Sequence, residues 1–157
     1  MLDIEASGFG ASGYPIEIGF AQGDGRRGCR LIRPEPGWTH WDDRAEQVHG
    51  ISRLTLERHG HAAPRVAGWL NDQLAGQTVY CDGWAHDYPW LARLFDAAGT
   101  RPAFRLEHLR SVLDEAGAAR WDATLGAVRR RSRAQRHRAS ADARAIQTAL
   151  LELQRVA

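Results

Sequence analysis

The chain contains no lysine: all 21 of its basic residues are arginine. We attribute this bias to genome composition and give it little weight. Cysteine is scarce as well: Cys29 and Cys81 lie far apart in the sequence and form no metal-binding or disulfide pattern. Reduced thiols and a cytoplasmic location are therefore expected.

Segments typical of secretion or membrane insertion are also missing. The sequence has no basic stretch followed by a short apolar one, and no apolar run long enough to span a bilayer. We therefore expect no membrane partner. The composition is ordinary for a globular protein, with 43% hydrophobic and 25% charged residues and a net charge of only +2. A chain of 157 residues fits one domain, which we expect to cover residues 1–157.

Short apolar runs bounded by turn residues predict five strands. The first three, at residues 1–6, 14–21 and 29–33, are joined by short loops, which indicates a three-stranded antiparallel meander. Two more strands are predicted at residues 77–82 and 103–107. Helices are predicted within 42–74, from Tyr88 to Gly99, and in the rest of the chain, where Ser140 caps the last one. This order predicts an α/β fold with helices covering a mixed sheet.

Two carboxylates, Asp3 and Glu5, interrupt an otherwise apolar strand. Residues two apart point to the same face of a strand, so these side chains stand next to each other. Like charges this close repel unless a cation lies between them or one of them stays protonated. A D-x-E pair is also common on exposed strands, so a site and a solvated face remain alternatives.

Further candidate residues lie on or near predicted helices. Asp87 comes just before a helix, where an aspartate is either a ligand or a cap. Asp142 falls in the first turn of the last helix, where the helix dipole also favours a carboxylate. His137 precedes Asp142 by five residues, which would put the two about 140° apart on one regular helix. They therefore converge only if His137 lies in the loop before that helix.

An arginine run comes shortly before Asp142, with no acidic residue in it: Arg129, Arg130, Arg131, Arg133, Arg136 and Arg138. Such a run is typical either of a solvated basic surface or of a phosphate-binding patch. The sequence by itself favours neither.

Three stretches, "DIEASG", "HDYPWLARLF" and "HRASADARA", resemble in this order the three motifs of the DEDDh (DnaQ-like) 3′→5′ exonucleases. That family includes proofreading exonucleases, RNase T and oligoribonuclease. The resemblance covers nearly the whole chain, and His137 followed by Asp142 is its most specific part, because family relatives with another chemistry have tyrosine there. It implies a ribonuclease H-like fold, a five-stranded mixed sheet with the first strand central.

The resemblance also implies a mechanism. Asp3, Glu5 and Asp142 would bind two divalent cations, Mg²⁺ or Mn²⁺, and Asp87 would assist through water. Two such ions about 3.5–4 Å apart stabilise the entering and leaving oxygens of a phosphodiester. His137 would be the general base that takes the proton of the attacking water, since histidine exchanges protons readily near neutral pH.

Substrate contacts are implied in the same way. The expected partner is the 3′ end of single-stranded RNA or DNA, and the expected product is a nucleoside 5′-monophosphate. The residues expected near the terminal nucleotide are Ser7, Gly8, Phe9 and the His49 of a "VHGIS" turn. A flexible loop carrying Arg129, Arg130 and Arg131 is expected to bind backbone phosphates a few nucleotides from the cut.

Two departures from the family pattern stand out. Only two residues precede Asp3, fewer than in most members, and Asp82 stands where many members have asparagine, which makes it a competitor of Asp87. A catalytically silent nucleic-acid-binding module on the same fold is an alternative, although the complete set of carboxylates and histidine argues against it. A ribonuclease H-like endonuclease would have no need of His137. The sequence leaves open whether RNA or DNA is the substrate and whether the chain forms a homodimer.

Overall fold

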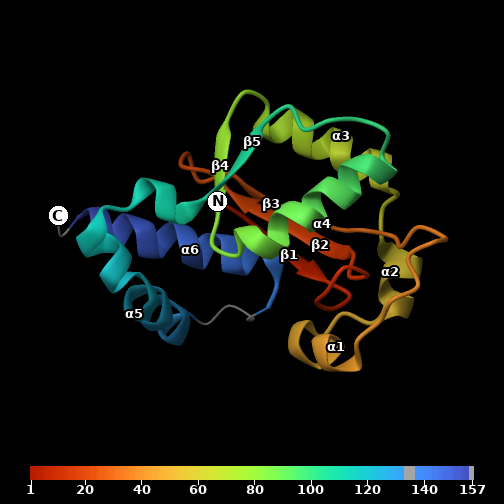
Figure 1. Cartoon of the computed structure of the whole chain (residues 1–157), viewed down its shortest axis with the longest axis horizontal. Helices are drawn as coiled ribbons and strands as arrows, with labels where there is room; N and C mark the ends of the chain where they lie inside the picture. The colour runs from red at the N-terminus through yellow and green to blue at the C-terminus, as the bar shows by residue number, and fades with distance from the viewer. Residues whose placement is uncertain (133–136, 156–157) are drawn as a thin grey trace.

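Five strands form the centre of the structure, a computed structural model that describes residues 1–132 and 137–155 (Figure 1). β1 (Leu2–Ala6) pairs antiparallel with β2 (Pro15–Ala21), and β2 pairs antiparallel with β3 (Arg27–Leu31). β4 (Thr78–Cys81) and β5 (Arg105–His108) pair in parallel. Because β4 lies next to β1, the strands follow the spatial order β3-β2-β1-β4-β5 with β1 central. The predicted mixed α/β fold is confirmed.

The described strands hydrogen-bond as a three-stranded and a two-stranded sheet, so no continuous ladder joins β1 to β4. The backbone of Ile4, in β1 at this junction, lowers the pKa of the Asp87 carboxylate in part. Asp87, one of the candidate site residues, therefore lies at the junction between the two sheets.

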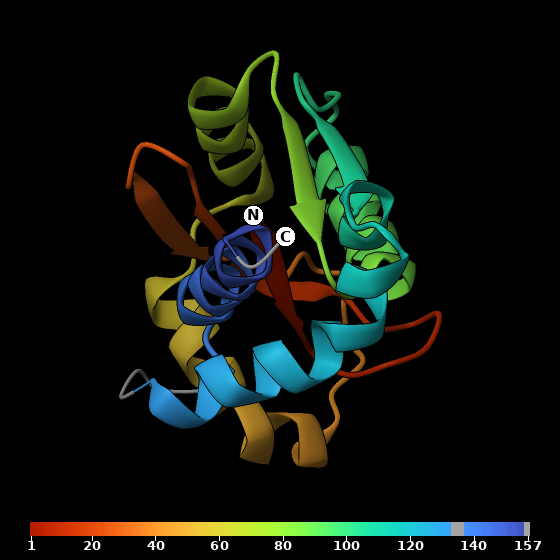
Figure 2. The same cartoon turned by 90° about the vertical axis from the view of Figure 1, so that its left-hand side faces the viewer.

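Helices cover both faces of the strands. α6 (Ala139–Gln154) packs against β1, β2 and β3 on one face, and α4 (Trp84–Ala97) packs against β1, β2 and β5 on the other. Figure 2 looks nearly along α6 and shows α5 passing beneath it. The remaining helical elements are α1 (Asp43–His49), α2 (Arg53–His59), α3 (Ala63–Leu74), the short 3₁₀ helix η1 (Leu109–Val112) and α5 (Glu115–Arg131).

Two apolar cores hold these layers together. The larger one lies between the strands, α3 and α4, and the smaller one lies between α5 and α6 around the fully buried Trp121. Among the described residues, no helix has the length and apolar character needed to cross a membrane.

The start of α4 differs from the prediction. The helix begins at Trp84, a full turn before Tyr88, because the N–H groups of His86 and Asp87 already donate to the carbonyl of Gly83. Pro89 lies inside the helix rather than at its start. Asp87 is consequently in the first turn of α4, not in front of it.

The arginine run also differs from the prediction. Arg129, Arg130 and Arg131 form the last turn of α5, so the expectation of a flexible loop is wrong for them. The sequence signal failed because arginine is a good helix former, and basic side chains suit the negative end of the helix dipole. Arg133 and Arg136 lie outside the described residues.

The N-terminus of α6 is held by β2 rather than by Ser140, which lies inside the helix. Glu17 of β2 accepts a hydrogen bond of 2.8 Å from the backbone N–H of Ala139. Gly19 lies two residues further along β2, and a Cβ atom there would clash with the backbone of Ala139 and Ser140. The glycine therefore lets the helix start approach the sheet closely, and the predicted local cap is replaced by a distant carboxylate.

Gly19→Ala is expected to lower the free energy of unfolding by about 1–3 kcal/mol, because backbone atoms cannot move aside as a flexible side chain can. Gly23→Ala is the matched control, since it makes the same change just after the same strand, where a Cβ would meet nothing within 4 Å. Urea unfolding in EDTA measures both. Equal stability of the two variants would show that α6 does not approach β2 so closely.

Candidate active site

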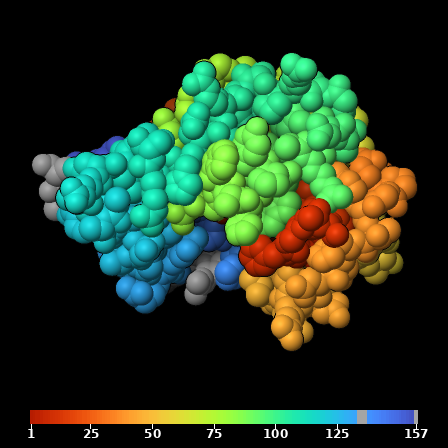
Figure 3. Space-filling model, in the orientation of Figure 1, coloured from red at the N-terminus to blue at the C-terminus, as the bar shows by residue number. Residues whose placement is uncertain are grey.

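Candidate residues from separate parts of the chain converge on one cavity of about 530 Å³. Asp3 and Glu5 reach it from β1, Asp87 from α4, and His137 from the segment before α6. Asp142, in the first turn of α6, does not line the cavity but lies next to Glu5 and His137. Figure 3 shows the surface hollowed between the green atoms of α4 and the blue residues near the start of α6, next to the red loop that follows β1.

Asp3 and Glu5 lie on one face of β1, as the alternation of the sequence predicts. Burial raises the pKa of Asp3 well above its usual value, and the charges of Asp87, Glu5 and Asp142 add to this rise. Burial likewise raises the pKa of Glu5 to about 7, with Asp142 as the next contribution. The pair therefore requires protons or a cation to be stable at neutral pH.

Asp87 is 4% exposed, and burial raises its pKa to about 7. The thiol of Cys81 and the backbone N–H groups of Ile4 and Gly83 hydrogen-bond to its carboxylate and oppose this rise. Asp82 has a different role: its carboxylate accepts a 2.8 Å hydrogen bond from the indole N–H of Trp121 on α5. It does not line the cavity, so Asp87 is the member of this pair that the fold brings to the site.

His137 lies in the loop before α6, in a left-handed backbone conformation with φ of 57°. The condition for its convergence with Asp142, a position in front of the helix, is therefore met. Ligand atoms of Glu5, His137 and Asp142 all lie within 4.8 Å of one another, in a group suited to a metal ion. The Asp142 carboxylate also accepts a 3.2 Å hydrogen bond from the backbone N–H of Arg138, which orients it.

Glu17 fixes the segment that carries His137, although the sequence analysis did not select it. Its carboxylate is fully buried and accepts bonds of 2.6–3.1 Å from the guanidinium of Arg138. The N–H of Ala139 and the thiol of Cys29 donate to the same carboxylate. The sequence does contain a sign of this role: Glu17 is a charged residue in the apolar stretch "IEIGFA", just as Asp3 and Glu5 are charged residues in an apolar strand.

The loop after β1 forms one wall of the cavity. Gly8 has a φ of +143°, and a Cβ there would clash with His40 and Asp42. Phe9 is 69% exposed at the rim, and its ring centroid lies 5.0 Å from that of His86. Ser7 is not part of the lining: it is buried, and its hydroxyl accepts from the N–H of Tyr14 within the loop.

Arg93 of α4 holds the far side of this loop. Its Nη1 donates to three successive carbonyls, those of Ala11, Ser12 and Gly13, at 3.3, 3.0 and 2.7 Å. The loop that carries Phe9 is thus attached to the same helix that carries Asp87.

His49 lines the cavity from the end of α1 and is 3% exposed. Burial lowers its pKa, which favours the neutral ring. Its Nδ1 accepts a 3.0 Å hydrogen bond from the N–H of Ile51, so the proton is on Nε2. This Nε2 finds no partner with hydrogen-bond geometry among the described residues. The backbone of Ala6 also interacts with this ring and partly opposes the fall in its pKa.

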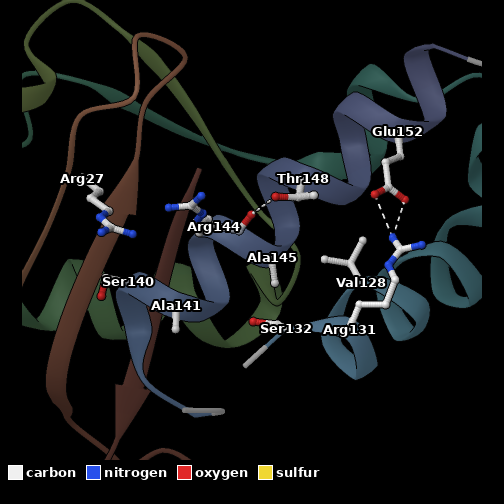
Figure 4. Close-up of a pocket in the computed structure, with 10 residues that line it drawn as sticks. All are labelled: Arg27, Val128, Arg131, Ser132, Ser140, Ala141, Arg144, Ala145, Thr148 and Glu152. Atoms are coloured by element: carbon white, nitrogen blue, oxygen red, sulfur yellow. Dashed lines mark hydrogen bonds and ion pairs between the residues drawn. The ribbon is translucent and has the colours of Figure 1, made fainter. Parts of the chain in front are cut away.

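The three arginines at the end of α5 point in different directions. Arg129 forms an ion pair of 3.4 Å with Asp142, whereas Arg130 is exposed. Arg131 pairs with both carboxylate oxygens of Glu152, at 2.7 and 2.8 Å, in a separate depression beside Arg27 and Arg144 (Figure 4). Arg129 and Arg130 line one depression together with Asp82 and Asp122, and Arg131 lies in another.

Comparison with solved structures places this architecture with the exonuclease I fold. E. coli exonuclease I matches in a zinc-bound complex with single-stranded DNA (TM-score 0.72, 14% identity) and in a further structure (TM-score 0.74, 13% identity). These matches cover 98% and 99% of this chain and 40% of the exonuclease chain. A moderately thermophilic exonuclease I from Methylocaldum szegediense matches with a TM-score of 0.70 and 17% identity, over 98% of this chain and 40% of that chain.

The chain thus spans about 40% of the length of these structures, and at such identities the likeness is one of fold. No protein-family model and no curated protein sequence matches the chain.

The raised carboxyl pKa values predict an unusual pH dependence in EDTA. Glu5 and Asp87 titrate near pH 7 in the folded protein but near 4 when unfolded, so between these values the folded state binds more protons. The free energy of unfolding should therefore fall as the pH rises from 5 to 7, by at most about 1.4 kcal/mol per pH unit for each carboxyl. Urea unfolding at several pH values measures this slope.

Glu5→Gln is the control that isolates one carboxyl, because glutamine has the same shape but does not titrate. Its slope between pH 5 and 7 should be shallower than that of the unmodified protein. Identical slopes would mean that Glu5 titrates near its ordinary pKa.

Proposed function

We propose that this chain is a metal-dependent 3′→5′ exonuclease. It would hydrolyse phosphodiester bonds at the 3′ end of single-stranded RNA or DNA and release nucleoside 5′-monophosphates. The observation that carries the proposal is the convergence of Asp3, Glu5, Asp87 and His137 on one cavity, with Asp142 next to Glu5 and His137. The direction of cleavage follows from the motif resemblance, and exonuclease I bound to single-stranded DNA has the same fold, which supports the substrate class.

The donor set fits hard divalent cations. Carboxylate oxygens are the ligands that Mg²⁺ and Mn²⁺ prefer. Burial, and after it the neighbouring carboxylates, raise the pKa values of Asp3 and Glu5, and a cation would offset both effects. We assign Asp3, Glu5 and Asp142 to two such ions, with Asp87 assisting through water. Bound there, the ions would stabilise the charge on the entering and leaving oxygens.

His137 is assigned the proton transfer. Its imidazole lies beside Glu5 and Asp142, so a water at the edge of the carboxylate cluster is within its reach. The bonds from Arg138 and Ala139 to Glu17 fix the backbone on the C-terminal side of this histidine. A base held in this way needs little reorganisation when it accepts a proton.

The terminal nucleotide would lie against the loop after β1 and against α1. Gly8 lets the loop pass close to His40 and Asp42, and the exposed ring of Phe9 can stack on a base. The Nε2–H of His49 can donate to a sugar or phosphate oxygen. Ser7 supports this loop from behind, and Arg130 is the exposed arginine of its run best suited to strand phosphates.

The test is a product assay on 5′-labelled single-stranded RNA and DNA with Mg²⁺ or Mn²⁺. We expect stepwise shortening from the 3′ end, release of nucleoside 5′-monophosphates, and no reaction in EDTA or with Asp142→Asn. A closed circular single strand is the control, because it has no end. Cutting of the circle at a similar rate would indicate an endonuclease, and tight binding without any product would favour a catalytically silent module.

His137→Ala is expected to lower kcat by about 10²–10⁴-fold, the usual contribution of a general base. Mn²⁺ affinity, measured by electron paramagnetic resonance, should persist in this variant because the carboxylate ligands remain. Asp142→Asn should instead weaken Mn²⁺ binding. Full activity of His137→Ala between pH 6 and 9 would show that another group takes the proton.

A further inference from the structure

Arg129 reaches the carboxylate cluster from the last turn of α5. Its Nη2 lies 3.4 Å from Oδ1 of Asp142, and its charge also opposes the rise in the pKa of Asp3. The Asp142 side chain is 10% exposed and that of Arg129 is 32% exposed, so the pair is largely shielded from water. A permanent positive charge thus stands next to one of the proposed metal ligands.

This ion pair is loose compared with two others in the same region. Arg138 makes contacts of 2.6–3.1 Å to both oxygens of Glu17, and Arg131 holds both oxygens of Glu152 at 2.7 and 2.8 Å. Arg129 makes one longer contact, and its buried Nε has no partner among the described residues. An ion pair in which the guanidinium leaves a buried N–H donor without a partner is less stable than one that is held by two parallel hydrogen bonds.

We propose that Arg129 is a built-in counter-cation that pairs with Asp142 in the metal-free protein and gives up this carboxylate when a divalent ion binds. The inference rests on the proposed function, which assigns Asp142 to the metal. The guanidinium and the ion compete for the same oxygen, so the measured metal affinity is reduced by the stability of the ion pair. In return, the positive charge reduces the repulsion among the carboxylates while no ion is present.

The neighbouring arginines provide matched controls. Arg130 is exposed, and Arg131 is bound to Glu152 in the depression of Figure 4, so neither contacts the cluster. Arg130→Gln and Arg131→Gln each remove the same formal charge from the same helical turn. Charges that are exposed to solvent and salt act weakly over a distance, so these changes should have little effect on an ion in the cavity.

The experiment is a Mn²⁺ titration followed by electron paramagnetic resonance, with the unmodified protein, the two controls, Arg129→Gln and Arg129→Met. Arg129→Gln and Arg129→Met should bind Mn²⁺ about fivefold more tightly, as expected from removing a partly shielded ion pair. The two control variants should stay close to the unmodified protein. Arg129→Met repeats the loss of charge with an apolar side chain that still fits a helix.

Thermal unfolding supplies a second readout. Arg129→Gln should unfold at a lower temperature in EDTA, and saturating Mn²⁺ should remove most of the difference, since a tighter ligand stabilises more. A purely structural role would lower the unfolding temperature equally with and without Mn²⁺, and that result would overturn the inference.

Two further outcomes separate this inference from the proposed function. If the unmodified protein binds Mn²⁺ and degrades strands, but both Arg129 variants bind Mn²⁺ no more tightly, only the counter-cation role is wrong. The same holds if Arg130→Gln tightens binding as much as Arg129→Gln does. If no variant binds Mn²⁺, the unmodified protein included, both proposals are wrong.

Discussion

Repulsion among carboxylates is the constraint on which the rest of this structure depends. Asp87 is buried and Asp3 and Glu5 are half-buried. Burial is the largest cause that raises the pKa of each, and neighbouring carboxylates add to the rise. Such an arrangement is stable only if other parts of the fold hold its members in place. The ion pair between Glu17 and Arg138 does this for the start of α6, and Arg129 compensates part of the charge at Asp142.

Glu17 differs from the carboxylates of the cavity in the number of its hydrogen-bond donors, and this difference distinguishes a structural carboxylate from candidate functional ones. Glu17 is completely buried, yet its oxygens accept from the Arg138 guanidinium, a backbone N–H and a thiol. Removing the guanidinium would leave the buried charge of Glu17 with only a backbone N–H and a thiol as donors, which is unfavourable. The carboxylates in the cavity have fewer donors and raised pKa values, a pattern that clusters at functional sites. Among the described carboxylates, those with raised pKa values are Asp3, Glu5 and Asp87, which all line the cavity.

Local patterns in the sequence predicted much of the fold and part of the site. The strand period placed Asp3 and Glu5 on one face, and the spacing of His137 and Asp142 required a loop before α6. What the sequence could not predict depends on contacts between distant segments. The helix start is capped by Glu17 of β2, Asp82 binds Trp121 of α5, and neighbouring arginines turn towards different carboxylates. Each of these depends on the packing of α6 against the strands and of α5 against α6.

The central claim is that the carboxylate cluster binds divalent cations. X-ray diffraction from Mn²⁺-soaked crystals, collected at the manganese absorption edge, tests it most directly, because anomalous peaks locate the metal without reference to activity. The account predicts strong peaks in the cavity, in contact with the carboxylates of Asp3, Glu5 and Asp142. A map with manganese bound only elsewhere on the protein, and none at these carboxylates, would contradict it.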